Sequence, residues 1–383
     1  MVRALGIDPG TGSMDILAID DESMKVLFEE SVPRDAVTRD PSIIIDVVRK
    51  VDNDVGLDAI VAPSGYGIPL KPVSEASYEE ICEATFIHGR DWVARLRIVG
   101  LRELMKMFKH SSLPAWFTPG VIHLPTVPRW RKANKIDLGT ADKVYSVAAA
   151  LWGEVDERGT PLGDVRIIVV EAGLAYNAAL AVKGGAIVDG VGGTSGPPGF
   201  LGMGFMDAEL AYALSHVEPG FSKARLFQGG ASSLAEVSSL EMLEKLYGEG
   251  HPSAVEAVNM MAESMVKAVM SLVPSLGDAP ERVYVSGRIF RLDRVGSEVR
   301  KRLREALGLL GGGEVVETPR LGSRTKEGAT GAALIASGLA GGRFKWLVEA
   351  LRLKESQGSI FDHVMLDRDV VEALKAEFRY CRL

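Results

Sequence analysis

The chain has 383 residues, a formal net charge of −7 at pH 7, 46% hydrophobic residues and 25% charged residues. This apolar content is enough for a large core and excludes an intrinsically disordered protein. The acidic balance argues against a nucleic-acid-binding protein held by a general basic field, and the length predicts two domains, or one large domain with appendages.

The sequence favours a cytoplasmic protein. It has no apolar run at its start and no stretch of about 18 uncharged apolar residues, so we expect neither a signal peptide nor a membrane span. Two cysteines, Cys82 and Cys381, are too few for a disulfide framework or a four-cysteine metal site, which suits a reducing cytosol. Asparagine occurs four times and glutamine twice. Scarcity of these thermolabile amides is typical of a protein from a thermophile.

The first half of the chain begins with strands around a glycine-rich turn. The apolar segment 2–8 predicts a buried strand, and the turn over 9–13 leads to strands over 14–20 and 25–32. Apolar positions recur at helical spacing in the next segment. The elements expected in the rest of this half are a helix over 41–52, a strand over 57–62, helices over 75–85 and 91–108, an irregular proline-rich segment over 114–129 and a helix over 140–152.

The same succession starts again near residue 165, with three short strands over 165–171, 175–182 and 186–189. The elements expected after them are helices over 207–214, 233–247 and 252–272, a strand over 281–286, a helix over 296–307, a strand over 314–317, a helix over 327–339 and two amphipathic helices within 343–383. Two such halves predict an α/β protein whose domains face each other across a cleft. The expected domain limits are 1–160 and 161–341, with a C-terminal helical tail over 342–383.

The turn of the first half carries the strongest local motif, Gly6-Ile7-Asp8-Pro9-Gly10-Thr11-Gly12-Ser13. A carboxylate at the end of a buried strand, followed by small residues, presents backbone N–H groups to phosphate oxygens. Gly10 and Gly12 permit close approach of the backbone, and Thr11 and Ser13 add hydroxyl donors. Asp8 is placed to hold Mg²⁺ through water. The alternative is an ordinary hairpin turn.

Three segments of the second half are candidate nucleotide contacts. Glu171 and Gly173 lie in its first hairpin, which lacks the hydroxyl residues of the first half. The loop 189–199 has five glycines but neither the lysine of a P-loop nor the spacing of a dinucleotide-binding turn. Its candidate contacts are Gly192, Gly193, Thr194, Ser195 and Gly196. The last strand ends in Ser286, Gly287 and Arg288, where a glycine permits an adenosine to lie over the backbone and the arginine to meet base or phosphate. A plain turn or a flexible linker is the alternative for each segment.

A cationic cluster stands out within this acidic chain. Arg129 and Arg131, with two neighbouring lysines, suit a phosphate or a carboxylate in a cleft. Asp137 and Asp142 follow as candidate acid–base or metal-water groups, and Thr140 is placed to cap the helix 140–152. The alternative is that these charges only solvate a surface.

Taken together, these motifs resemble the superfamily of acetate and sugar kinases, Hsp70 and actin, and within it the acetate and butyrate kinases, including an archaeal family of predicted butyrate kinases. The resemblance extends in patches over residues 1–340. The segments that carry it, besides the turns above, are Leu57–Val61, Leu70-Lys71-Pro72, Ser77-Tyr78, Val127–Lys143, Val182–Gly196 and Thr325–Ser337. It implies two ribonuclease-H-like domains that resemble each other, with ATP and Mg²⁺ in the cleft.

The resemblance also implies site residues and shows departures. The loop after strand 57–62 would contact the substrate through Ser64, Gly65, Tyr66 and Lys71, and Glu327 would hold a metal-bound water. Butyrate kinases carry an arginine that grips the carboxylate, a histidine that stabilises the transferred phosphoryl group, and a glycine-rich second hairpin. The corresponding segments here are Pro63-Ser64-Gly65, Leu138 and Glu171-Ala172-Gly173.

Our first hypothesis is an ATP- and Mg²⁺-dependent phosphotransferase that acts on a small acceptor such as a short-chain carboxylate. Asp142 or Asp137 would orient the acceptor, and Arg129 or Arg131 would neutralise charge. The alternative is a catalytically weak nucleotide-binding protein with a regulatory or assembly role. The expected partner is a small molecule, not a nucleic acid or a membrane, and a homodimer is left open.

Overall fold

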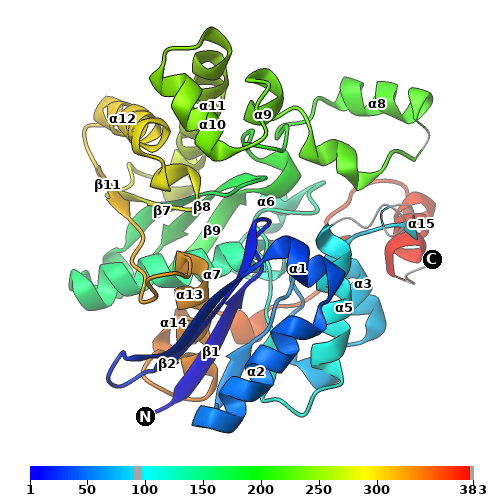
Figure 1. Cartoon of the computed structure of the whole chain (residues 1–383), viewed down its shortest axis with the longest axis vertical. Coiled ribbons are helices and arrows are strands. Elements are labelled where there is room, and N and C mark those ends of the chain that lie inside the picture. Colours follow the sequence, from blue (N-terminus) through cyan, green and yellow to red (C-terminus); the bar gives the residue numbers. More distant parts are fainter. Residues whose placement is uncertain (90, 92–96, 219, 380–383) are drawn as a thin grey trace. The chain divides into compact units, whose positions relative to one another are not determined.

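The computed structural model describes residues 1–89, 91, 97–218 and 220–379 and separates into two compact units (Figure 1). Unit 1 consists of Met1–Val165, Lys183–Val188 and Thr318–Leu383, and unit 2 of Arg166–Val182 and Asp189–Glu317. Residues 318–341, which we expected in the second domain, thus belong to unit 1.

Among the described residues, unit 1 contains a six-stranded sheet in the order β3-β2-β1-β4-β6-β5. Its strands are β1 (Arg3–Asp8), β2 (Ser13–Asp20), β3 (Val26–Pro33), β4 (Ala59–Val61), β5 (Lys71–Pro72) and β6 (Ala115–Phe117). The first three are antiparallel, whereas β4 pairs in parallel with both β1 and β6. The three-stranded start is confirmed. The proline-rich segment predicted as irregular contains β6, which is too short to show a strand period.

The helices of unit 1 cover both faces of this sheet. They are α1 (Arg34–Arg39), α2 (Ser42–Val55), α3 (Tyr78–Thr85), α5 (Arg97–Lys109), α6 (Arg129–Lys132), α7 (Ala141–Trp152), α13 (Glu327–Leu339), α14 (Lys345–Ala350) and α15 (Arg368–Arg379). Figure 1 shows α2 and α5 on one side of β1 and β2, and α13 and α14 on the other. Helix α5 corresponds to the helix expected over 91–108. Residues 92–96 of the expected range lie outside the described residues.

Helix α13 packs directly on β1 because a glycine lies at their contact. A Cβ on Gly6 would lie 2.2 Å from the backbone nitrogen of Ala333. The opposite side of the helix packs on α7 in the same way, since a Cβ on Gly331 would lie 1.8 Å from the carbonyl oxygen of Tyr145. These close approaches explain why the C-terminal segment belongs to unit 1.

The second sheet within the residues described has five strands in the order β11-β10-β7-β8-β9, and its residues belong to unit 2 except for Lys183 of β8 and residues 186–188 of β9, which belong to unit 1. Its strands are β7 (Arg166–Ala172), β8 (Asn177–Lys183), β9 (Ala186–Val191), β10 (Arg282–Ser286) and β11 (Glu314–Glu317). Strand β10 pairs in parallel with β7 and with β11. Three consecutive strands followed by parallel ones repeat the order β3-β2-β1-β4-β6 of unit 1. This repetition confirms the predicted duplicated α/β fold.

The helices of unit 2 are α8 (Ala208–Val217), α9 (Ala231–Leu234), α10 (Leu240–Gly248), α11 (Pro252–Leu276) and α12 (Asp293–Leu309). The single helix predicted over 233–247 is wrong. Glu236 has φ = 55°, a left-handed conformation that a helix cannot continue through. The next helix then starts afresh, because the side chain of Ser239 accepts a hydrogen bond from Met242 N at 3.2 Å.

The structure bears on two expectations from the sequence, the lack of a membrane span and the reduced state of the cysteines. Within the described ranges, none of the helices combines the length and hydropathy that a bilayer span requires. Cys82 on α3 is disulfide-bonded, which departs from the reduced cysteines that the count favoured. Cys381 lies outside the described residues.

Candidate functional site

The turn after β1 is built around a buried ion pair. Asp8, the last residue of β1, is 4% exposed, and its Oδ2 lies 2.7 Å from Nζ of Lys326. The same ammonium lies 3.9 Å from Oδ2 of Asp15 on β2, whose Oδ1 accepts a hydrogen bond from Ser31 Oγ at 2.7 Å. Lys326 directly precedes α13 and was not among the predicted site residues. Folding therefore brings a cation to this turn from 318 positions away in the sequence.

Two glycines leave the room that this ion pair occupies. A Cβ on Gly10 would lie 2.3 Å from Nζ of Lys326, and a Cβ on Gly328 would lie 2.8 Å from Oδ2 of Asp8. The glycine of the predicted phosphate-binding turn thus leaves room for the lysine, and its contact with a ligand stays a prediction. The start of α13 adds a favourable dipole for the Asp8 carboxylate.

A second cation holds the turn from the other side. Arg34, the first residue of α1, is 4% exposed and donates from Nη1 to the carbonyl oxygens of Pro9 and Gly10, both at 3.3 Å. Its backbone nitrogen donates to Gly12 O at 3.2 Å. Carbonyl groups of the turn are therefore directed toward a guanidinium. Arg34 was not among the predicted site residues. The signal available in the sequence was its place directly after the third predicted strand, and the structure pairs the end of that strand with the turn, Pro33 with Ser13.

Asp142 lies in the first turn of α7, near enough for the charge of Lys326 to act on it. Burial favours a raised pKa for Asp142, but the ammonium of Lys143 at 2.7 Å, a hydrogen bond from Thr140 and the charge of Lys326 outweigh burial and hold the pKa below its ordinary value. Asp142 is therefore a carboxylate, unsuited to donating a proton. Thr140 occupies the N-cap position of α7, as predicted, but its hydroxyl donates to the Asp142 side chain and makes no capping hydrogen bond with the backbone of the helix.

The other predicted acceptor groups have structural partners. Asp137 is 6% exposed, and its Oδ1 accepts a hydrogen bond from Gly139 N at 2.7 Å, which shapes the loop before α7. Arg131 donates from Nη1 to the carbonyl oxygen of Val188 at 2.7 Å, and Arg129 belongs to the same short helix, α6. The predicted roles of Asp137, Arg129 and Arg131 therefore stay predictions. Of the two predicted acceptor aspartates, Asp142 is the one near Lys326.

Ser64 belongs to a buried hydroxyl network. Its Oγ is fully buried, donates to Ala62 O at 2.9 Å and accepts from Thr118 N at 3.0 Å. The Thr118 hydroxyl is 2.5 Å from the hydroxyl of Tyr145, and burial raises the pKa of that tyrosine. The network connects β4 and β6 to α7. A substrate contact by Ser64 stays a prediction.

The rest of the predicted substrate loop lies against α7 and α3. The carbonyl oxygen of Gly65 accepts a hydrogen bond from Ala141 N at 3.1 Å, which attaches the loop to the first residue of α7. Tyr66 follows in the same turn. Lys71 lies on β5, with Nζ 2.6 Å from Oε1 of Glu80. The loop that carries Gly65 and Tyr66 thus reaches the helix that carries Asp142.

In unit 2 the turn after β10 packs on the second predicted hairpin. Ser286 lies opposite Glu171 in the pairing of β10 with β7. Gly287 follows with φ = 98°, and a Cβ there would lie 2.3 Å from the carbonyl oxygen of Ala172. A glycine is therefore required for this turn to lie beside the hairpin that contains Gly173. The two motifs are neighbours in the sheet, and their roles at a nucleotide stay predictions.

The glycine loop of unit 2 is a packed loop at the start of β8. Residues Gly193–Ser195 form a single 3₁₀ turn, and Gly193 has φ = 60°. A Cβ on Gly196 would lie 2.6 Å from the carbonyl oxygen of Asn177, and the amide of Asn177 donates to Pro198 O at 2.7 Å. Thr194 lies within the 3₁₀ turn. The loop thus follows β9 in the sequence and packs on the first residue of β8, the strand that leaves the second hairpin. Arg288, the remaining predicted contact, precedes the 3₁₀ helix Ile289–Arg291.

The residues at Asp8 do not fit a magnesium ion bound directly to this carboxylate, and the predicted contact through water stays a prediction. Mg²⁺ lies about 2.0–2.1 Å from its oxygen ligands, and the ammonium of Lys326 is 2.7 Å from the same carboxylate oxygen. In the part of the chain that the structure describes, no three His, Cys, Asp or Glu side chains are grouped to hold a metal ion. Glu327 follows Lys326 in the sequence, and its role at a metal-bound water stays a prediction.

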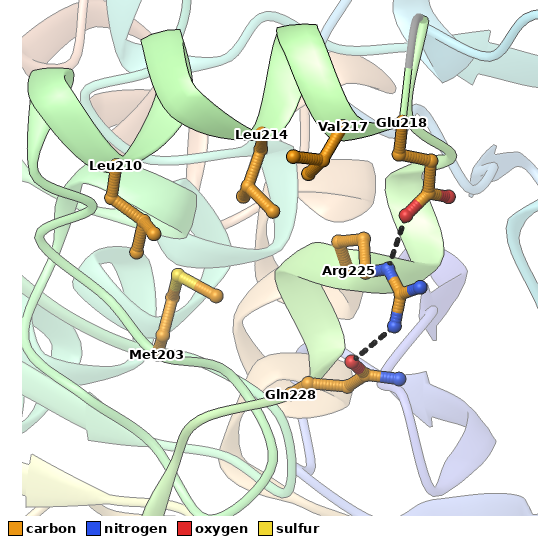
Figure 2. A pocket seen from close by; sticks show the side chains of 7 residues that line it. All are labelled: Met203, Leu210, Leu214, Val217, Glu218, Arg225 and Gln228. Carbon is orange, nitrogen blue, oxygen red and sulfur yellow. Dashed lines mark hydrogen bonds and ion pairs between the residues drawn. The ribbon is translucent and has the colours of Figure 1, made fainter.

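A separate apolar groove of about 580 Å³ lies in unit 2 under α8 (Figure 2). Met203, Leu210 and Leu214 form its apolar wall. At its rim, Arg225 donates to Glu218 at 2.8 Å and to Gln228 at 3.0 Å. Its lining residues lie outside the predicted nucleotide motifs.

Solved structures define the class of this fold. A propionate kinase from Francisella tularensis subsp. tularensis SCHU S4 is 15% identical, with a TM-score of 0.61 over 87% of this chain and 98% of that chain. An acetate kinase from Entamoeba histolytica is 12% identical, with a TM-score of 0.57 over 80% and 87%. An acetate kinase from Porphyromonas gingivalis is 14% identical, with a TM-score of 0.56 over 87% and 98%. The chain therefore has the fold of the acetate and propionate kinases.

The chain belongs to the family described as "Protein of unknown function (DUF1464)", whose sequence model matches residues 6–366. A search of curated proteins gives no match. The predicted resemblance to acetate kinases is confirmed for the fold. A closer relation to the butyrate kinases stays a prediction.

Proposed function

We propose that this protein is an ATP-dependent phosphotransferase that transfers the γ-phosphate of ATP to a small carboxylate. The single observation that carries the proposal is the turn after β1, where two buried cations, Lys326 and Arg34, meet a glycine-rich backbone on a fold shared with acetate and propionate kinases. Small residues and positive charge together suit a phosphate group.

In this proposal each unit supplies one part of nucleotide recognition. In unit 1, the backbone of Gly10 and Gly12 and the hydroxyls of Thr11 and Ser13 bind phosphate oxygens. In unit 2, the hairpin, the glycine loop and the turn after β10 bind the rest of the nucleotide. The residues involved are Glu171, Gly173, Gly192, Gly193, Thr194, Ser195, Gly196, Ser286, Gly287 and Arg288. The contact of Gly287 with Ala172 supports this grouping.

The state of Asp142 favours a carboxylate as the acceptor. A hydroxyl acceptor loses a proton during the reaction, and a base is most effective when its pKa lies near the working pH. The pKa of Asp142 is held below the ordinary aspartate value, mainly by Lys143 against the effect of burial, which makes it a weak base. A carboxylic acid is already ionised at neutral pH, so its oxygen attacks without prior deprotonation.

The proposed reaction forms a bond between a carboxylate oxygen and the γ-phosphorus and breaks the bond to the β,γ-bridging oxygen, which leaves as ADP. Such a transfer depends on positioning and on stabilising charge over the phosphoryl oxygens. Lys326 and Arg34 are the cations at the turn after β1, and Arg129 or Arg131 would neutralise the acceptor. Asp142 would orient the acceptor through Lys143, its partner at 2.7 Å.

A second candidate is a nucleotide-binding protein with little catalysis and a regulatory or assembly role. The observation that favours it is Leu138, which is 4% exposed and stands where the resemblance places a catalytic histidine. A buried leucine supplies no charge to a phosphoryl group. The internal hydrogen bonds of Ser64 also favour this candidate, because they occupy a group expected to contact substrate.

The deciding experiment measures acyl phosphate directly. Purified protein is incubated with ATP, Mg²⁺ and acetate, propionate or butyrate, and acyl phosphate is trapped as the hydroxamate. We expect product with the wild type, at least a hundredfold less with Asp8→Asn, and wild-type rates with Asp46→Asn on α2, whose side chain is 64% exposed. Calorimetric ATP binding is recorded for each protein.

The outcomes separate the two candidates. ATP binding with no hydroxamate from any acid would refute the carboxylate kinase and support the regulatory protein. Equal product from wild type and Asp8→Asn would exclude the turn after β1 as the phosphate site. Phosphorylation of a sugar hydroxyl, but of no acid, would contradict the role assigned to Asp142.

A further inference from the structure

A lysine ammonium lies directly against the carboxylate that the sequence predicted to hold Mg²⁺ through water. Nζ of Lys326 lies 2.7 Å from Oδ2 of Asp8 and 3.9 Å from Oδ2 of Asp15. The lysine side chain is 11% exposed, and the two carboxylates are 5% and 1% exposed. A buried carboxylate is unfavourable unless a cation or hydrogen-bond donors compensate it. This ammonium therefore compensates the aspartate that was expected to bind magnesium.

The position of the ammonium is built into the fold. The backbone nitrogen of Lys326 donates to Oδ2 of Asp15 at 2.9 Å, so the lysine is attached to β2 at both of its ends. Helix α13 begins at the next residue and packs on β1. The side chain fills the space above Gly10 that a Cβ would take. Moving the ammonium away from Asp8 would leave two buried carboxylates facing each other.

A divalent ion bound directly to Asp8 conflicts with this arrangement. The ion would lie about 2.0–2.1 Å from a carboxylate oxygen, and the ammonium already lies 2.7 Å from Oδ2. Two cations would then stand side by side in a buried place, where water screens their repulsion poorly. The ion and the ammonium are therefore alternatives at this oxygen.

We propose that the Lys326 ammonium is the resident cation of the turn after β1, and that the nucleotide-free protein binds no divalent ion at Asp8. A divalent ion would reach the protein only as a complex with the nucleotide phosphates. This last statement rests on the proposed function. The absence of a metal site in the nucleotide-free protein does not.

The test is a titration of Mn²⁺ into the full-length, chelator-treated, nucleotide-free protein, with free Mn²⁺ measured by electron paramagnetic resonance. Lys326→Met removes the ammonium and leaves both carboxylates, so we expect a new Mn²⁺ site at least tenfold tighter than any in the wild type. Adding Asp8→Asn to this variant abolishes the site. Lys326→Arg keeps a cation, and Lys301→Met changes a lysine of α12 whose side chain is 62% exposed. Both controls behave as the wild type.

Two results would overturn the inference. One is a tight Mn²⁺ site in the wild type that Asp8→Asn weakens. The other is a folded Lys326→Met protein, by circular dichroism, that gains no site. If Lys326→Met does not fold, the comparison of wild type with Asp8→Asn decides alone. A wild-type Mn²⁺ site that Asp8→Asn weakens refutes the inference, and the lack of such a site in the wild type supports it. The titration contains no nucleotide, so failure of the proposed function, seen as lack of ATP binding, is recorded separately.

Discussion

Replacing His123 tests how much the burial of a neutral histidine lowers the free energy of unfolding at acid pH. His123 ends a short 3₁₀ helix in unit 1 and is 2% exposed, and burial lowers its pKa from 6.5 to about 4. The folded state therefore binds fewer protons than the unfolded state between these values, and stability falls as the pH drops. A shift of this size corresponds to about 3 kcal/mol below pH 4, and to about 2 kcal/mol at pH 5.

The assay is urea unfolding at pH 7 and pH 5, followed by tryptophan fluorescence. All five tryptophans lie in the segments assigned to unit 1, so the signal reports on the unit that contains His123. We expect the wild type to lose about 2 kcal/mol more than His123→Gln between the two pH values. His110→Gln, which changes an exposed histidine of unit 1, serves as the control and follows the wild type. An equal pH-dependent loss in wild type and His123→Gln would refute the reasoning.

Three glycine substitutions test the close contacts of the fold. Gly331→Ala places a Cβ 1.8 Å from Tyr145 O and is expected to lower the unfolding free energy of unit 1 by about 3 kcal/mol in the same urea assay. Gly163→Ala, in the short 3₁₀ helix Leu162–Asp164 of unit 1 with open space around it, should instead be neutral or stabilising by up to about 1 kcal/mol, and a similar loss in both would contradict the packing argument. Gly287→Ala combines a φ of 98° with a contact at 2.3 Å to Ala172 O, and faster hydrogen exchange in β10 is the expected result. Unchanged hydrogen exchange in β10 would refute the claim that this turn requires a glycine at position 287.

Local sequence predicted those parts of the fold in which neighbours along the chain decide the structure. The strands around the first turn were expected from residues 2–32, because apolar runs separated by glycine leave few alternatives. The helix predicted over 140–152 is α7 from Ala141 to Trp152. The break between α9 and α10 was missed because it depends on the left-handed backbone at Glu236, a residue type with no preference for that conformation.

The candidate site was predicted in part, and its cations were missed for a physical reason. Asp8 and its turn are contiguous in sequence, and such a motif can be recognised locally. Lys326 reaches Asp8 only because α13 returns to β1, and the packing of Ala333 over Gly6 that determines this return leaves no periodic pattern. The signal available was a lysine next to Glu327, in a segment already singled out by resemblance. Arg34 was missed since its role depends on the carbonyl groups of the turn.

Asp8, predicted to contact phosphate and metal, and Asp142, predicted to orient the acceptor, share one electrostatic feature. Asp8 and Asp142 each have a lysine ammonium at 2.7 Å, from Lys326 and Lys143. An adjacent ammonium stabilises the ionised carboxylate and makes it a poorer base, as the lowered pKa of Asp142 illustrates. A site of this kind suits a reaction in which charge is neutralised and no proton has to be removed. In the proposed function a carboxylate acceptor meets this condition because it is already ionised at neutral pH, whereas a hydroxyl acceptor would need a base, and the lowered pKa of Asp142 makes that residue a poor one.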